Sequence, residues 1–428
     1  AASNIAVIAI DEASIANIGR WPWPRDVHAK LIDKLAAAKA KTIGYTVFFS
    51  EPQIDQGLIY VRKIKDTIPP DISALEAFAP VNQVLGEAEE KLNMDATLAS
   101  SIAHAGNVVL PAAFELKEPK GNPESPLPDF ALANTIGDAD NLSLSVIDPI
   151  LPLDIFGSKA AAVAHLVQVR DVDGVVREDP LFVNYYGRAI PSMALSLAAQ
   201  SLNLKPQDLK LEEDQALVGR LKIPLEEGAI MLPQFYKSSD GKYAFETDSF
   251  FDVLNDKVPA SKYAGKIVIV GSTAKGVGTL FRTPAAKDFD AAQLAAYVTS
   301  SILQEQTITR PAWGSAASLL AFLIVAAFLM FILPRLPAGQ AALASGVLLI
   351  VLLASEFGLM VGSAKWVPLV LPAVLLLAGY LLLTTNRFLF TEAGKVKADA
   401  ESAETNRMMG LALQGQGRLD EALDRYLR

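Results

Sequence analysis

The sequence predicts a mixed α/β domain with a largely parallel sheet over residues 1–310, followed by three membrane-spanning helices and a short helical tail. Strand-like and helix-like segments alternate through residues 1–310, which is the order typical of a parallel sheet. No charged residue occurs between Arg310 and Arg335, and the chain is apolar over most of the next fifty residues. Hydrophobic residues make up 51% of the chain, above the roughly 45–50% of soluble domains, as a membrane region requires.

Local sequence patterns predict the main elements of the first domain. These are strands over 4–10, 41–49, 107–114 and 266–270, and helices beginning near Pro24 and over 96–104. The helix near Pro24 is predicted because Val27, Leu31 and Leu35 recur at helical spacing. The stretches 51–93 and 115–158 are rich in proline, glycine and acidic residues, so long loops or insertions are expected there.

Three apolar segments predict membrane spans at about residues 315–333, 339–359 and 367–389. Each reaches the roughly 20 residues that cross a bilayer, and none keeps the polar face of an amphipathic core helix. Glu356 is the one ionisable residue inside a span. It is either a functional intramembrane charge or a carboxylate that reaches the interface.

Basic residues near the spans set the expected orientation. Arg335, Arg387, Lys395 and Lys397 lie on one side of the predicted spans, and Lys365 lies on the other. By the positive-inside rule the first side is cytoplasmic, which places residues 1–310 on the extracytoplasmic side. Trp313 and Trp366 fall at the outer span ends, where indole rings favour the interface. Together with Glu356 they are the predicted membrane-interface or coupling residues.

Composition excludes several classes of site. A net charge of -9 makes nucleic acid a poor partner, and the absence of cysteine removes disulfides and thiolate chemistry. The three histidines, His28, His104 and His165, are too scattered for a metal site with local spacing. Asp171 and Asp173 resemble the start of a calcium loop, but the twelfth position is Phe182 instead of a carboxylate, so a simple turn is expected. We therefore predict no metal, no cofactor and no catalytic residue.

A ligand site is predicted where the first strand passes into the first long helix, since open α/β sheets bind ligands at such an edge. The candidate residues are Asp11, Arg20, Trp21, Trp23, Arg25, Gly271 and Ser272. Each tryptophan precedes a proline, so Trp21 and Trp23 are expected in extended backbone with their rings on one face. They could equally cover the sheet edge or a subunit interface. The segment GSTAKGVG from Gly271 lacks the spacing of a phosphate loop, and a flexible turn explains it as well.

The chain also resembles a known family. VIAIDEASIANIGRWPWPRDVHAKLIDKLAAAKAKTIGYTVFFSEP, with IAHAGNVVLP, DVDGVVRE and YAGKIVIVGSTAKGVGTLFRTP further on, is similar to the second type of CHASE domain. The resemblance implies a bacterial extracytoplasmic sensor followed by three transmembrane helices and a cytoplasmic kinase or cyclase, with one more membrane helix ahead of the sensor. Residues 289–303 lack the Gly-Val-Glu stretch usual in that family.

The tail after the third span is expected to be helical. Residues 390–407 carry alternating charges and predict a solvated cytoplasmic stalk. Residues 408–428 resemble the first part of a tetratricopeptide repeat, which implies a cytoplasmic partner. In relatives with this layout such repeats can accompany a Ser/Thr kinase, and no kinase motif is present here.

These observations favour a transmembrane signalling receptor, anchored in the lipid bilayer and forming a dimer or higher homo-oligomer, that responds to an extracytoplasmic ligand or protein. A structural protein that assembles homo-oligomers is the first alternative. A cell-surface hydrolase or transferase is the second.

Overall fold

The computed structural model describes residues 3–427 except 125, 138, 140–141 and 238–242. The chain divides into two compact units, residues 1–309 and 310–428, which are described separately. The first is a mixed α/β domain and the second is helical, as predicted.

A seven-stranded sheet forms the centre of the first unit. Its order is β14 (Thr247–Ser249), β1 (Ile5–Ile10), β15 (Ile267–Ser272), β2 (Thr42–Tyr45), β3 (Val108–Leu116) and β5 (Val146–Ile150), with β6 (Ala162–His165) also paired to β3. Every pairing is parallel except that of β5 with β3. The predicted strands match β1, β2, β3 and β15, although β2 ends four residues earlier than predicted.

Both faces of this sheet are buried, because alternate residues of each strand enter two different cores. In β1, Ile5 and Val7 join one core, whereas Ile8 and Ile10 join the other. Helices α9 (Met193–Ser201) and α11 (Ala291–Leu303) cover the first face. Helices α2 (Arg25–Ala37), α6 (Met94–Ala105) and α10 (Phe250–Leu254) cover the second. The result is a three-layer α/β/α arrangement.

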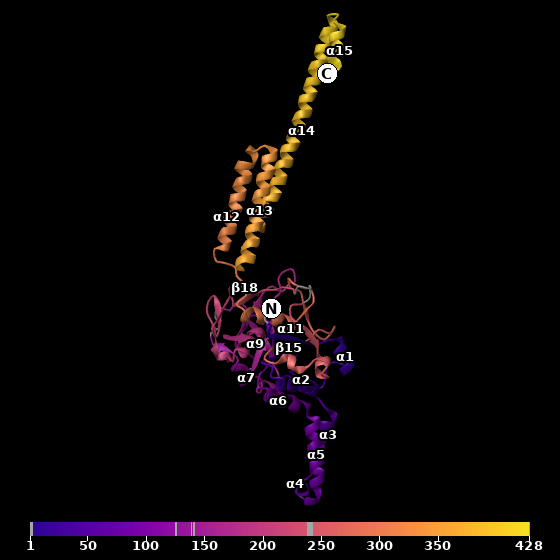
Figure 1. The fold of residues 1–428 in the computed structure, drawn as a ribbon, viewed down its shortest axis with the longest axis vertical. Helices are drawn as coiled ribbons and strands as arrows, with labels where there is room; N and C mark the ends of the chain where they lie inside the picture. Colours follow the sequence, from indigo (N-terminus) through magenta and orange to yellow (C-terminus); the bar gives the residue numbers. More distant parts are fainter. Residues whose placement is uncertain (1–2, 125, 138, 140–141, 238–242, 428) are drawn as a thin grey trace. The chain divides into compact units, whose positions relative to one another are not determined.

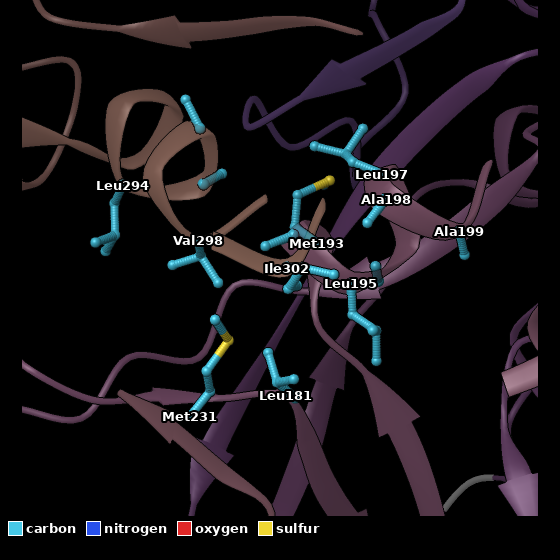
Figure 2. Close-up of a cluster of buried hydrophobic side chains, with 14 of the residues drawn as sticks. Leu181, Met193, Leu195, Leu197, Ala198, Ala199, Met231, Leu294, Val298 and Ile302 are labelled. Atoms are coloured by element: carbon cyan, nitrogen blue, oxygen red, sulfur yellow. The ribbon is translucent and has the colours of Figure 1, made fainter. Parts of the chain in front are cut away.

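Close packing between α9 and α11 fixes the first face. Figure 2 shows Met193 of α9 near Val298 and Ile302 of α11, within one continuous apolar cluster. Gly44 of β2 lets α9 approach, since a Cβ there would lie 2.8 Å from a methyl group of Leu197. The helices are therefore packed tightly onto the strands.

Smaller elements surround the central sheet. They are β4 (Ile136–Gly137), β7 (Asp179–Pro180), β8 (Phe182–Tyr185), β9 (Arg188–Pro191), β10 (Leu209–Leu211), β11 (Gln215–Val218), β12 (Leu221–Pro224), β13 (Ile230–Pro233), β16 (Leu280–Phe281), β17 (Phe289–Asp290), β18 (Thr307–Ile308), α1 (Glu12–Ile18), α7 (Asp129–Leu132) and α8 (Asp154–Gly157). Those from β7 to β13, and α9 between them, lie in stretches that the sequence analysis did not assign.

The expected loop over 51–93 is instead largely helical. Helices α3 (Gln56–Thr67) and α5 (Ala79–Leu92) pack on each other, joined by the short α4 (Pro70–Ser73), and form an arm that extends from the sheet layers (Figure 1). Asp55 caps α3 by accepting a hydrogen bond from the backbone of Leu58 at 2.9 Å. The stretch is therefore an insertion and not a loop, and the loop alternative was wrong because proline and acidic residues at helix starts were interpreted as signs of a loop.

The second unit contains three helices long and apolar enough to span a membrane. They run over Gly314–Arg335, which begins with α12 (Gly314–Ala327), over α13 (Ala338–Ser363) and over α14 (Val370–Gly415). Helix α14 begins three residues after the start of the predicted third span and continues through the predicted stalk without a break. Gly417, with φ of 78°, lies between α14 and α15 (Leu419–Leu427).

Candidate functional site

The parallel strands bring three of the predicted residues to one edge of the sheet. β15 lies between β1 and β2, and all three run in the same direction. Asp11 follows the carboxyl end of β1, while Gly271 and Ser272 end β15. Because β2 ends at Tyr45, the loop that begins with Thr46 reaches the same edge.

A cavity of about 400 Å³ lies at this edge, within the roughly 300–1,000 Å³ of small-molecule sites. Four of the predicted residues line it: Trp21, Trp23, Arg25 and Ser272. The loops after β2 and β15 supply most of the remaining lining, with Phe48 and Phe281 as further aromatic groups. The predicted residues outside the lining are Asp11, Arg20 and Gly271.

Asp11 has a structural role at this edge. Its carboxylate caps α1 by accepting from the backbone N–H of Ser14 at 2.8 Å, and it also accepts from the Ser249 hydroxyl at 2.9 Å. Gly271 is a close-approach position, since a Cβ would lie 2.6 Å from both Ala292 Cβ and Thr46 Oγ1. Arg20 is exposed. These three residues therefore shape the edge without contacting the cavity.

The two tryptophans differ in environment, which the sequence did not predict. Trp23 is 3% exposed and belongs to the core, and its indole N–H donates to the carbonyl of Gly19 at 2.8 Å. Trp21 is only partly buried and meets the Trp23 ring edge-on, with ring centroids 5.2 Å apart. The Trp21–Pro22 peptide bond is cis. Trp21 is therefore the member of the pair with surface available to a ligand.

Arg25 lines the cavity, but its charge is already balanced by the protein. Its Nε lies 3.4 Å from a carboxylate oxygen of Asp95, and its guanidinium donates to the carbonyl of Glu51 at 2.8 Å. The same group lies over the ring of Phe49, 4.8 Å from the centroid. Burial lowers the pKa of Arg25, and the charges of Asp95 and Glu51 oppose this effect.

His28 is a cavity residue that the sequence analysis missed as part of this site. It is buried among aromatic rings, including Trp21 at 5.8 Å and Phe49 at 5.2 Å between centroids. Burial, assisted by the nearby positive charge of Arg25, lowers the pKa of His28 to about 3. The imidazole is therefore neutral at physiological pH. The sequence could have indicated the burial of His28 only through its position in the first turn of α2, on the same apolar face as Leu31 and Ile32.

A second, smaller chamber of about 20 Å³ adjoins the cavity and shares Leu166, Phe281 and Ala291 with its lining. Its polar lining consists of His165, Gln168, Asp179 and Ser192. These residues come from the end of β6, the loop after it, β7 and the N-cap of α9. No sequence motif connects them, so they were not predicted.

Among the residues that the structure describes, no group of three or more His, Asp or Glu side chains could hold a metal ion. Asp171 and Asp173 both form ion pairs with Arg177, at 2.6 and 2.7 Å. Their side chains therefore stabilise a turn, as expected from the missing twelfth ligand of a calcium loop.

The predicted membrane-interface residues lie in the second unit. Trp313 immediately precedes α12 and is 49% exposed, and Trp366 lies under the guanidinium of Arg310 at 4.9 Å. Glu356 is on α13 and is partly buried. Arg387 donates to the carbonyl of Leu336 at 2.9 Å. The first basic residue of α14 therefore contacts the turn between α12 and α13.

Comparison with known protein families decides the assignment of the first unit. A model of the CHASE2 domain matches residues 1–333, more than three quarters of the chain. The chain belongs to the CHASE2 domain family. No curated protein and no solved structure matches it. A CHASE2 sensor domain followed by three helices that can span a membrane fits a signalling receptor.

Proposed function

We propose that this CHASE2 protein is the sensing and anchoring part of a transmembrane receptor. In this proposal residues 1–310 lie outside the bacterial inner membrane and bind a small molecule in the Trp21 cavity. The signal passes through the spans to a cytoplasmic kinase or cyclase that lies outside this sequence. The partial tetratricopeptide repeat at 408–428 would contact a cytoplasmic partner.

The observation that carries the proposal is the continuity of α14 after the CHASE2 domain and the first two spans. Its 46 residues extend about 69 Å at 1.5 Å per residue, more than twice the roughly 30 Å hydrocarbon core. A continuous helix transmits rotation or translation over its length more directly than a flexible linker does. Helix α14 therefore suits a receptor that changes the position of an output domain.

Basic residues support the orientation. Arg387 contacts the turn that contains Arg335, so both basic groups lie at the same end of the helical unit. Ser318, near the start of α12, donates to the carbonyl of Pro368 at 2.7 Å, which defines the opposite end. The positive-inside rule then assigns the Arg387 end to the cytoplasm.

Topology can be tested with single cysteines, because the chain has none of its own. We expect Lys365→Cys to react with a membrane-impermeant maleimide in spheroplasts, and Glu401→Cys to react only after permeabilisation. The reverse pattern would refute the orientation.

Ligand binding is tested by thermal-shift screening of the whole chain in detergent against neutral, anionic and cationic metabolites. A ligand that binds only the native state raises the unfolding midpoint by mass action. We expect at least one compound to do so, and Trp21→Ala to abolish its effect. An unchanged response in Trp21→Ala would exclude the cavity as the sensing site.

The α3–α5 arm favours an assembly role as a second candidate function. Ile59, Tyr60, Ile64 and Val84 are 48%, 62%, 49% and 64% exposed on this arm, an unusual number of large apolar groups in one hairpin. Homo-oligomer formation through the arm predicts that Ile64→Asp lowers the oligomer mass in detergent. An unchanged mass would leave the receptor as the sole candidate.

A further inference from the structure

The small chamber beside the Trp21 cavity contains unpaired buried polar atoms. His165 is 1% and Asp179 is 3% exposed, yet His165 Nε2 and Asp179 Oδ1 have no hydrogen-bond partner among the described residues. Gln168 Oε1 is likewise buried and unpaired within that part of the chain. Buried polar atoms without partners are rare in native proteins and unfavourable, so three in one chamber indicate a group that binds there.

The hydrogen bonds already present define the chemistry of these atoms. His165 Nδ1 accepts from the backbone N–H of Val167 at 3.2 Å, and burial lowers the pKa of His165 to about 3. The neutral ring therefore carries its proton on Nε2, which is a donor. Gln168 donates through Nε2 to Asp179 Oδ2 at 2.9 Å, which leaves as acceptors Gln168 Oε1 and, when the Asp179 carboxyl is ionised, Asp179 Oδ1. The chamber thus presents one donor and two acceptors.

This pattern matches a hydroxyl group. A hydroxyl oxygen can accept from His165 Nε2–H while its proton is donated to Asp179 or Gln168. An ammonium group fits less well, because its protons would face the N–H donor of His165. A carboxylate or phosphate fits less well, because its oxygens would face the two acceptor oxygens. The volume of about 20 Å³ admits one group of about the size of water, for which roughly 10–15 Å³ suffices.

The larger cavity favours a neutral ligand for a separate reason. Arg25 is its only charged lining residue among those described, and Asp95 already balances that charge. The nearby helix starts are also occupied: Asp290 accepts from the first backbone N–H groups of α11, and Ser192 accepts from Leu195 in α9. Neither helix start is therefore open to an anion.

The aromatic groups complete the site. Trp21, Phe48 and Phe281 provide partly exposed rings in the cavity, and such rings can pack against the C–H faces of saturated, hydroxylated rings. Phe281 lines both spaces, so a molecule that fills the cavity lies against the wall that the cavity shares with the chamber. We propose that the ligand is a neutral polyhydroxylated ring, a sugar or cyclic polyol, which places one hydroxyl between His165, Gln168 and Asp179. This inference rests on the proposed receptor function and specifies its ligand class.

The test is isothermal titration of the whole chain in detergent with glucose, N-acetylglucosamine and myo-inositol. Glucose 6-phosphate and glucosamine serve as charged counterparts, and diacetylchitobiose distinguishes a free sugar from the end of a glycan. We expect a neutral compound to bind, and Asp179→Asn and Gln168→Leu each to weaken it at least tenfold. Asp214→Asn is the matched control, because Asp214 is exposed in the turn between β10 and β11 and lines neither space.

Several outcomes would overturn the proposal. Equal affinity in wild type and both inner variants would exclude the chamber as a subsite, and binding of charged compounds alone would exclude the ligand class. A buried water only, with no binding of any polyol, would also refute it. If another compound binds and Trp21→Ala abolishes that binding, the receptor proposal survives and only the polyol subsite fails.

Discussion

Replacing Asp179 with asparagine should stabilise the CHASE2 domain, and the gain should grow with pH. Burial raises the pKa of Asp179 from 3.8 to about 7, although the hydrogen bond from Gln168 acts in the opposite direction. In the unfolded chain the carboxyl ionises near its ordinary pKa. The folded domain therefore loses stability as pH rises from about 4 to about 7, because the folded state binds more protons over this window.

The magnitude follows from the size of the pKa change. A rise from 3.8 to about 7 corresponds to about 4 kcal/mol, at about 1.36 kcal/mol for each pH unit. At pH 8 the whole of this roughly 4 kcal/mol opposes folding, whereas at pH 5.5 ionisation of Asp179 opposes folding by only about 2 kcal/mol. Asparagine stays neutral and can accept the same hydrogen bond from Gln168. Asp179→Asn should therefore be more stable than wild type by up to about 4 kcal/mol at pH 8.

The assay is scanning calorimetry of the whole chain in detergent at pH 5.5 and pH 8. At roughly 2 °C for each kcal/mol, the domain transition of Asp179→Asn should lie about 8 °C above wild type at pH 8 and about 4 °C above it at pH 5.5. Asp214→Asn should show no such difference, since Asp214 is exposed. A gain that is independent of pH, or a loss of stability at pH 8, would refute the reasoning.

Three further substitutions test how the edge of the sheet is built, each measured as the shift of the same calorimetric transition. Trp23→Ala should destabilise the domain by roughly 3–5 kcal/mol because it empties a core position, whereas Trp313→Ala should leave this transition in place. Gly271→Ala should lower stability by about 1–3 kcal/mol, since the added Cβ would clash with Ala292 and Thr46. Its control is Gly86→Ala in α5, where the added Cβ meets open space and stability should rise by up to about 1 kcal/mol. Asp11→Ala should destabilise the domain by roughly 1–2 kcal/mol because α1 loses its cap. An unchanged transition would show that the hydrogen bonds from Ser14 and Ser249 to Asp11 contribute nothing to stability.

The elements predicted correctly are those fixed by local sequence. β1 is a continuous apolar run and β15 begins with one, and the four-residue spacing of Leu31 and Leu35 in α2 follows from a single buried face. The spans follow from length and hydropathy alone. The 51–93 stretch was expected to be a long loop or an insertion, and only the loop alternative was wrong. Its helices bury few side chains, and the prolines near the helix starts were interpreted as loop signals despite the periodic apolar positions.

The candidate site was only partly accessible from sequence for a different reason. Rules for parallel sheets place Ser272 and Trp21 at one edge, since strand ends and the following loops share that edge. The chamber residues come together only through tertiary pairing: β6 brings His165 to the sheet edge, and the pairing of β7 with β13 positions Asp179. No spacing in the sequence encodes such a contact. Likewise, only the fold decides that Trp23 is in the core while Trp21 retains surface.

The position of α11 connects this site to the membrane part of the chain. Ala291, the first residue of α11, lines both the cavity and the chamber, and every residue from 292 to 302 is buried. A helix buried on all sides moves as a body or not at all, because closely packed interiors deform little. Only the segment from 304 to 313 separates the end of α11 from the start of α12. In the proposed receptor, a ligand that displaces Ala291 would act on this buried helix, and the chain from 304 to 313 is all that separates the end of this helix in sequence from the first apolar helix.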